Sequence, residues 1–301
     1  MNFVGLDIGG TTIKAGLVSE SGVVLSTQQA PTIVDSVDGL IETLARLVNQ
    51  FESVARFEAV GMGIPGIRST RTHMVEASPH IPSIHHVNLE AILSKRLKIR
   101  VISENDANVG AYAEWTCGAG KGLDHMAYLT IGTGLGGGLI LAGRLYRGAS
   151  GYAGEMGHVT VEPDGRQCAC GSRGCLETRV SGPGLAQTAR ELSKDPNPAA
   201  WDAESVYKAA CAGDKVASET FAITGRFLGI ACANLINLLN LEMIVIGGGV
   251  LASGDLLLDS ARNEVQRRAF EPAARICPIV QSQLWPNSGL IGAAMLARDH
   301  Q

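Results

Sequence analysis

A strand, a turn rich in glycine and threonine, and a second strand are predicted at the start of the chain and again in its middle. The first copy is GLDIGGTTIKAGLV, residues 5–18, and the second is AYLTIGTGLGGGLIL, residues 127–141. In both copies an alternating strand follows the turn, whereas the common mononucleotide and dinucleotide loops lead into a helix. The pattern therefore favours two β-hairpins over a P-loop or a dinucleotide-binding fold.

The two turns are predicted to hold phosphate. Successive glycines let backbone N–H groups converge on an anion, and threonine hydroxyls add further donors. An ordinary tight turn is the alternative for either hairpin taken alone. The predicted nucleotide contacts in these turns are Gly9, Gly10, Thr11, Thr12, Thr133 and Gly134.

Asp7 ends the first strand, directly before the first turn. An acid in a buried strand is costly unless a cation or a hydrogen-bond donor compensates its charge. A hydrated Mg²⁺ ion that accompanies nucleotide phosphates would do so, and a turn-capping role is the alternative. Lys14, in the second strand, points either to the nucleotide or to solvent.

A third glycine cluster, Gly247, Gly248 and Gly249, lies between the apolar strand MIVI and a helix that starts near Asp255. Residues without side chains permit the close approach of a flat ligand such as adenine or ribose. A tight turn between a strand and a helix would use glycines as well.

Strands and helices alternate along the chain, which predicts a layered α/β fold. Apolar residues at helical spacing follow a predicted Ser36 cap, a long apolar helix is expected over about 218–239, and Ser288 is a candidate cap for a last helix. At 301 residues the chain has room for two domains. We expect residues 1–117 and 118–287 to form them, joined near 117–121, with residues 288–301 packing back on the first.

The turn SENDAN places Glu104, Asn105 and Asp106 at the carboxyl end of a strand, where open α/β sheets expose ligands. Asp106 also stands where a helix begins, so an N-cap role is one interpretation. The other is a general base that accepts a proton from a hydroxyl attacking a γ-phosphate.

The segment GEMGHVTVEPDGRQCACGSRGCLE, residues 154–177, carries the most specific signal. It offers one nitrogen and three sulfur ligands for a closed, structural Zn²⁺ site, with reduced cysteines in a loop as the alternative. Such a site would fix the flanking Glu155 and Glu177, whose carboxylates could then bind the hydroxyls of a neutral sugar. The predicted zinc ligands are His158, Cys168, Cys170 and Cys175.

Charge and targeting signals restrict the partners. The net charge is -4, no run of lysine and arginine occurs, and no apolar stretch is long and uninterrupted enough to suggest a membrane span. The first residues show no signal peptide. We therefore expect a cytoplasmic protein without a nucleic-acid or membrane partner.

The hairpins, the SENDAN turn, GEMGH with its cysteines and VIGGGV together resemble the ROK family of bacterial sugar kinases and repressors. The resemblance covers essentially the whole chain. It implies two actin-like, ribonuclease H-like ATPase domains that flank a nucleotide and sugar cleft, with a zinc-stapled loop. It also implies that ATP and Mg²⁺ bind the hairpins and the GGG turn.

The same resemblance implies that Asp106 is the catalytic base. The positions that match the family's hexose contacts are Asn105, Asp106, Glu155, His158 and Glu177, and Gly66 is added to the predicted substrate set. His158 would serve zinc with one ring nitrogen and a sugar hydroxyl with the other. His80 stands where many members have an asparagine, so it is predicted to replace that sugar contact.

The reaction implied is transfer of the ATP γ-phosphoryl group to a hexose, with glucose and glucose 6-phosphate as the first expectation. Glu155 favours glucose over N-acetylmannosamine, since a histidine commonly replaces it in kinases for the latter. N-acetylglucosamine, N-acetylmannosamine, fructose and allose remain alternatives. A sugar-binding ROK regulator is a less favoured alternative, because the first hairpin starts at residue 3 and leaves no room for a DNA-binding arm. The family also suggests a homodimer or homotetramer.

Overall fold

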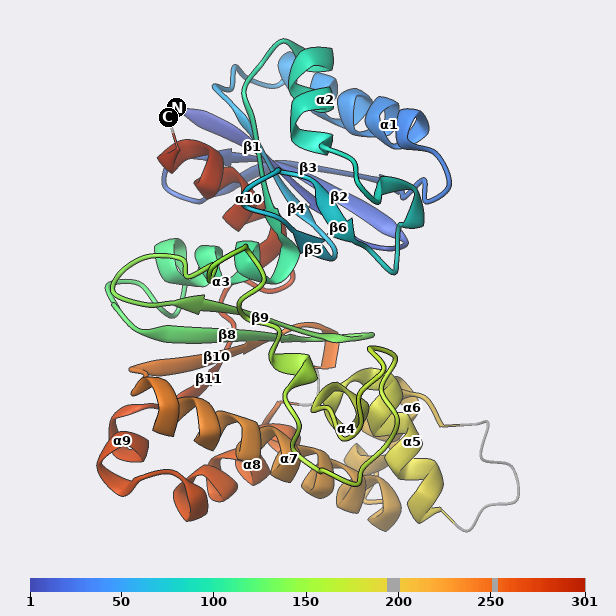
Figure 1. Cartoon of the computed structure of the whole chain (residues 1–301), viewed down its shortest axis with the longest axis vertical. Helices are drawn as coiled ribbons and strands as arrows, with labels where there is room; N and C mark the ends of the chain where they lie inside the picture. The colour runs from blue at the N-terminus through green and yellow to red at the C-terminus, as the bar shows by residue number, and fades with distance from the viewer. Residues whose placement is uncertain (194–200, 251–253, 301) are drawn as a thin grey trace. The chain divides into compact units, whose positions relative to one another are not determined.

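The computed structural model describes residues 1–193, 201–250 and 254–300. Two compact units make up the chain (Figure 1). The first comprises Met1–Leu123, Gly138–Gly154 and Ser282–Gln301, and the second comprises Asp124–Gly137 and Glu155–Gln281. The structure thus assigns residues 118–123, 138–154 and 282–287 to the first unit, although the sequence-based division has them in the second.

The first unit is built on a five-stranded sheet in the order β3-β2-β1-β4-β7. Strand β1 pairs with β2 in antiparallel register and with β4 in parallel register, and β4 pairs in parallel with β7. The carboxyl ends of β1, β4 and β7 therefore meet at one edge of the sheet. The bounds are β1 Asn2–Ile8, β2 Thr12–Ser19, β3 Val24–Pro31, β4 Val60–Ile64 and β7 Val101–Asn105.

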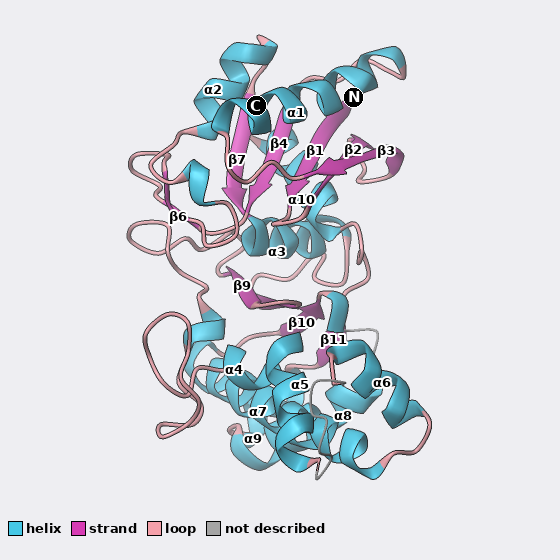
Figure 2. Cartoon of the chain, turned by 90° about the vertical axis from the view of Figure 1, so that its right-hand side faces the viewer, coloured by secondary structure: helices cyan, strands magenta, loops and turns pink. Residues whose placement is uncertain are grey.

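Helices cover both faces of this sheet (Figure 2). Helices α1 (Val37–Asn49) and α2 (Leu89–Leu97) lie on one face, and α3 (Asp106–Cys117) and α10 (Ser288–Asp299) lie on the other. The predicted Ser36 cap of α1 is confirmed, because its side chain accepts a hydrogen bond from the Gly39 N–H. The unit also contains η1 (Gln50–Ser53), β5 (Ile67–Arg68), β6 (Val75–Ala77) and η2 (Pro82–Ile84).

Glycines in the sheet let α10 lie directly on it. A Cβ atom at Gly5 would lie 1.8 Å from the Leu290 carbonyl oxygen, and one at Gly61 would lie 1.8 Å from the Ala293 carbonyl oxygen. Side chains at these two positions would push the helix away. The predicted Ser288 cap is wrong, because Asn287 occupies the cap position and Ser288 is already the first helical residue.

The second unit has a four-stranded sheet in the order β11-β10-β8-β9, in which β10 is parallel to β8 and β11. Its strands are β8 (Met126–Ile131), β9 (Leu135–Ile140), β10 (Met243–Gly247) and β11 (Ile279–Gln281), and the part of β9 from Gly138 onward is counted with the first unit. The helices are α4 (Glu177–Val180), α5 (Gly182–Leu192), α6 (Ala203–Cys211), α7 (Lys215–Leu239), α8 (Asp255–Arg268) and α9 (Glu271–Ile276), and η3 spans Met156–His158.

Helix α7 is long and apolar enough, by length and composition alone, to cross a membrane. Lys215, Glu219 and Arg226 interrupt its apolar sequence, so it is not the uninterrupted run to which the sequence-based expectation refers. The same properties are found in the core helices of globular domains, and α7 packs against α8, α5 and α6. Phe221 and Leu228 are buried in this packing.

Candidate functional site

Asp7 lies at the end of β1, between Lys14 on β2 and Gly63 on β4. A Cβ atom at Gly289, in the first turn of α10, would lie 2.4 Å from the Asp7 Cγ atom, so the carboxylate sits against this helix N-terminus. Burial raises the pKa of Asp7, and the charge of Lys14 opposes this shift. Among the residues that the structure describes, none donates a hydrogen bond to the carboxylate. A half-buried carboxylate that accepts no hydrogen bond from these residues fits a hydrated Mg²⁺ ion.

The first glycine-rich turn is a tight turn with its threonines exposed. The Gly9 N–H donates to the Thr12 carbonyl oxygen at 3.1 Å, and the Thr32 hydroxyl donates to the Gly9 carbonyl oxygen at 2.7 Å. Thr11 and Thr12 are exposed and open to a ligand. A Cβ atom at Gly10 would lie 2.9 Å from the Cβ atom of His80. The structure thus places His80 beside this turn.

Lys14 lies beside a surface hollow on the first unit. The hollow has a volume of about 500 Å³ and is also lined by Gln29 and Asn287. The lysine is half-buried there, and its charge acts on the pKa of Asp7. Lys14 is the cross-strand partner of Asp7, so both side chains project from the same face of the sheet.

Asp106 is the first residue of α3, and Asn105 is the residue that caps this helix. The Asn105 Oδ1 atom accepts a hydrogen bond from the Asn108 N–H at 3.0 Å. The interpretation of Asp106 as the N-cap is therefore wrong. Its Oδ1 atom accepts from the Ala107 N–H at 2.9 Å and from Asn105 Nδ2 at 3.1 Å. These two contacts fix the carboxylate at the carboxyl end of β7.

Gly66 lies beside Asn105. The Asn105 Nδ2 atom donates to the Gly66 carbonyl oxygen at 3.0 Å. Gly66 has a φ of 110°, and a Cβ atom there would lie 2.1 Å from the Ala77 carbonyl oxygen, so only glycine fits. The predicted residues Gly66, Asn105 and Asp106 are thus in one hydrogen-bonded group.

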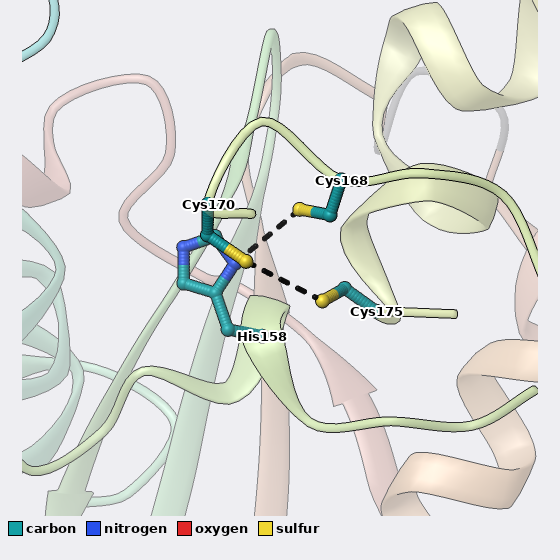
Figure 3. Close-up of side chains that lie close together, drawn as sticks. All are labelled: His158, Cys168, Cys170 and Cys175. Carbon is teal, nitrogen blue, oxygen red and sulfur yellow. Dashed lines mark hydrogen bonds between the residues drawn. The ribbon is translucent and has the colours of Figure 1, made fainter. Parts of the chain in front are cut away.

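The four predicted zinc ligands converge in the second unit (Figure 3). Their ligand atoms all lie within 4.8 Å of one another. Cys170 Sγ is 3.7 Å from Cys175 Sγ, and His158 Nδ1 is 3.7 Å from Cys168 Sγ. Bonds of about 2.3 Å would place neighbouring ligands of a tetrahedral zinc about 3.8 Å apart. The arrangement therefore fits Zn²⁺.

Cys170 and Cys175 are not joined by a disulfide. The distance between their Sγ atoms is much longer than a disulfide bond of about 2.05 Å. Burial and the neighbouring cysteines raise the pKa of Cys175 to about 12. Zinc binding would therefore have to displace a proton from this thiol.

Glu155, His158 and Glu177 form one electrostatic group in the second unit. Burial raises the pKa of Glu155, His158 lowers it and Glu177 raises it further. One oxygen of Glu177 is already engaged, because Glu177 Oε2 accepts a hydrogen bond from the Leu135 N–H at 2.8 Å. The carboxylates flanking the cysteine cluster thus lie near each other, and one of them holds the second glycine-rich turn.

The second glycine-rich turn is in contact with other segments on both of its sides. The Gly182 N–H donates to the Gly132 carbonyl oxygen at 2.8 Å. A Cβ atom at Gly134 would lie 2.7 Å from Glu177 Oε2, and one at Gly157 would lie 2.3 Å from the Leu135 carbonyl oxygen. Thr133, at the tip, is exposed.

A cavity of about 680 Å³ lies within the second unit. It brings together two segments that the sequence predicts to bind nucleotide, through Thr133 and Gly249. Its other walls come from α5, α6 and α7, including Pro183, Ala203 and Phe221. Sequence reasoning missed these wall residues, because nothing in their local patterns separates them from ordinary helix residues.

The three glycines at the end of β10 and directly after it have different surroundings. A Cβ atom at Gly247 would lie 2.2 Å from the Tyr128 hydroxyl, and Gly248 has a φ of 92° and lies against the Ile131 backbone. Gly249 faces open space and lines the cavity. Packing therefore accounts for the first two glycines, and Gly249 is the one that a ligand could approach.

Solved structures and curated proteins similar to this chain define its class. The structure of a ROK family glucokinase from Streptomyces griseus, in complex with glucose and AMPPNP, is 35% identical with a TM-score of 0.87, covering 99% of this chain and 100% of that chain. The α/β fold is that of the ROK kinases, in the actin-like ATPase superfamily.

The family follows from the sequence comparisons. A glucokinase from Thermotoga maritima is 34% identical over 99% of this chain and 98% of its own length. An N-acetylmannosamine kinase from Escherichia fergusonii is 32% identical over 99% of both. The family model described as the ROK family matches residues 3–300. The chain belongs to the ROK family.

Proposed function

We propose that this protein is a sugar kinase that transfers the γ-phosphoryl group of ATP to a hexose, with the 6-hydroxyl of glucose as the acceptor. The observation that carries the proposal is the placement of two acids at one edge of the sheet in the first unit. Asp7 is the last but one residue of β1, and Asp106 directly follows β7. Phosphoryl transfer to an alcohol needs one acid to hold a metal ion and another to accept a proton.

Asp106 is the proposed base. The Asn105 side chain and the Ala107 N–H fix its Oδ1 atom, so the carboxylate is oriented before substrate binds. It would accept the proton of the attacking hydroxyl as the new P–O bond forms and the bond between the γ-phosphorus and the β,γ-bridging oxygen breaks, which releases ADP. Asn105 would position the sugar from the same turn.

Asp7 is the proposed contact to Mg²⁺, which when bound would neutralise charge on the phosphates. The exposed hydroxyls of Thr11 and Thr12 and the backbone N–H groups of the turn would donate hydrogen bonds to phosphate oxygens. In the second unit, Thr133 has the same exposed position on its own turn. The adenosine part of ATP is assigned to the cavity beside Gly249.

Glu155, His158 and Glu177 are the proposed hexose contacts of the second unit. The similarity to glucokinases and the presence of Glu155 support glucose as the acceptor. The similar N-acetylmannosamine kinase keeps that sugar as the second candidate. His80, which lies beside Gly10, is proposed to contact either the sugar or the phosphates.

A coupled assay with ATP, Mg²⁺ and a panel of hexoses tests the proposal. We expect glucose to give the highest kcat/KM, with N-acetylmannosamine, N-acetylglucosamine, fructose and allose well below it. A higher value for another sugar would reassign the substrate and leave the kinase in place. Hexose binding by calorimetry without any turnover would instead indicate a sugar-binding regulator.

A further inference from the structure

A buried ion pair joins the turn that carries Asp106 to a distant loop of the first unit. Arg147 Nε donates to Glu104 Oε2 at 2.5 Å. The Glu104 side chain is 5% exposed and the Arg147 side chain is 31% exposed. A carboxylate this buried is strongly destabilising when its cation is removed, so the two side chains depend on each other.

The second oxygen of Glu104 holds the turn itself. Glu104 Oε1 accepts hydrogen bonds from the Asn105 N–H at 2.9 Å and from Asn108 Nδ2 at 3.2 Å. Asn105 in turn caps α3 and binds Asp106 Oδ1. One carboxylate therefore connects Arg147 to the backbone on which Asp106 is placed.

Arg147 begins a loop, residues 147–154, that leads in sequence to Glu155. The loop is closed by the Ala153 N–H, which donates to the Arg147 carbonyl oxygen at 3.2 Å. A second hydrogen bond holds the loop to the segment that follows β5, because the Thr70 N–H donates to the Ser150 carbonyl oxygen at 3.0 Å. Near this point Gly151 has a φ of 99° and approaches the Arg68 backbone.

The region around Arg68, which Gly151 approaches, is also connected to β7. The buried Arg68 side chain pairs with Glu90 at 3.1 Å. Glu90 Oε2 accepts hydrogen bonds from the Ser103 N–H at 2.8 Å and from the Ser103 hydroxyl at 2.7 Å. Ser103 immediately precedes Glu104 on β7. The loop is therefore connected to this strand twice, once through Arg68 and Glu90 and once through Arg147.

We infer that Glu104 and Arg147 are positioning residues, which set the place of the Asp106 turn and of the loop before Glu155 in relation to each other. The inference rests on the proposed function, because Asn105, Asp106 and Glu155 are the proposed hexose contacts. Neither member of the pair is assigned contact with substrate. Their effect passes through the backbone at Asn105 and through the course of residues 147–154.

Kinetics of three variants test this role. In R147M and E104Q we expect kcat/KM for glucose to fall about 10- to 100-fold, since small displacements of reacting groups cost this much. The KM for ATP should change less than about twofold, because the cavity assigned to adenosine is lined by other residues. R147K, which keeps the cation, should recover part of the loss.

The matched control is R268M. Arg268 pairs with Glu264, whose side chain is 6% exposed, on helix α8. The variant removes the nearest cation of a carboxylate as buried as Glu104, although Arg226 and Arg267 remain within 4 Å of it. We expect it to lower the melting temperature less than R147M does, with kcat/KM for glucose unchanged. If R147M also leaves kcat/KM for glucose unchanged, the pair is only structural and the inference fails.

Amide hydrogen exchange gives a readout that needs no turnover. R147M should speed exchange at the Asn105 amide and at the Ala153 amide together, whereas R268M should change neither. Unchanged exchange at Asn105 in R147M would overturn the inference even if wild-type protein phosphorylates glucose. A wild-type protein that phosphorylates no hexose would refute the proposed function instead, and the exchange result would still decide whether the pair couples turn and loop.

Discussion

The Glu177 carboxylate accepts a hydrogen bond from the Leu135 N–H at 2.8 Å. Glu177 follows Cys175 by two residues, and Leu135 begins β9 just after the second glycine-rich turn. The cysteine cluster and this turn are therefore mechanically connected through one side chain. Loss of metal from the cysteine cluster should therefore also make the turn that is proposed to bind phosphate less ordered.

Zinc removal should therefore affect both stability and nucleotide binding. We expect about one zinc per chain by mass spectrometry, and a fall of about 10 °C in melting temperature after chelation. The KM for ATP, measured with Mg²⁺ restored in excess, should rise. C175S should behave like the chelated protein, whereas C211S, at an exposed cysteine outside the cluster, should not.

Zinc affinity should depend on pH in a defined direction. The pKa of Cys175 is raised to about 12, so this thiol is protonated at neutral pH in the metal-free protein. Each zinc bound must release that proton, and apparent affinity should therefore increase as the pH rises. Competition with a chromophoric chelator between about pH 6.5 and 8 measures the slope. A flat profile would show that this thiol is already ionised.

Replacing Asp106 with asparagine should remove the base and leave the fold. We expect D106N to lower kcat by about 10²- to 10⁴-fold. Its melting temperature should change by less than about 2 °C, because Asn105 supplies the helix cap. Asp38, in the first turn of α1, offers a matched control, and D38N should keep full turnover. Substantial kcat in D106N would remove the base assignment.

Asp7 is expected to lower the stability of the folded protein at neutral pH and to be required for Mg²⁺-dependent activity. Burial raises its pKa above the ordinary 3.8, so the folded protein holds a proton that the unfolded chain releases. The free energy of unfolding should therefore fall as the pH rises from about 3.8 through the raised pKa. D7N should abolish this fall and leave the metal-free protein at least as stable at neutral pH. It should also raise the Mg²⁺ concentration needed for half-maximal rate.

Filling the cavity of the second unit should weaken ATP binding selectively. Ala203 lies at the start of α6 and lines the cavity. A203F should raise the KM for ATP by at least about tenfold, equivalent to about 1.4 kcal/mol, and leave the KM for glucose unchanged. A209F, on the same helix but away from the cavity lining, is the control. An unaltered KM for ATP in A203F would place adenosine elsewhere.

Local signals in the sequence were sufficient for much of the fold. Apolar spacing and the Ser36 hydroxyl define α1, and alternation on both sides of the first turn defines β1 and β2. The four predicted zinc ligands could be named from the sequence because they belong to one segment and have restrictive chemistry and spacing, and the structure brings their ligand atoms together. Each of these features depends on neighbours in the chain, so a single sequence contains the information.

Long-range packing accounts for what the sequence did not indicate. Glu104 and Arg147 are 43 residues apart and have no shared periodicity. The helix cap at Asn105 rather than Asp106 was missed because both side chains are strong capping groups, and only the backbone geometry decides between them. The walls of the 680 Å³ cavity come from three helices and two turns that meet only after folding.

The close approach of α10 to Gly5 and Gly61 has a consequence for biosynthesis. The strands of the first sheet are complete in the nascent chain by residue 105, yet the helix that lies on their glycines begins at residue 288. During translation one face of this sheet cannot be fully packed until the last part of the polypeptide has been synthesised. The first unit to be synthesised is therefore finished last. On a ribosome that stalls before residue 288, α3 could cover part of this face, but the part around Gly5 and Gly61 would stay exposed.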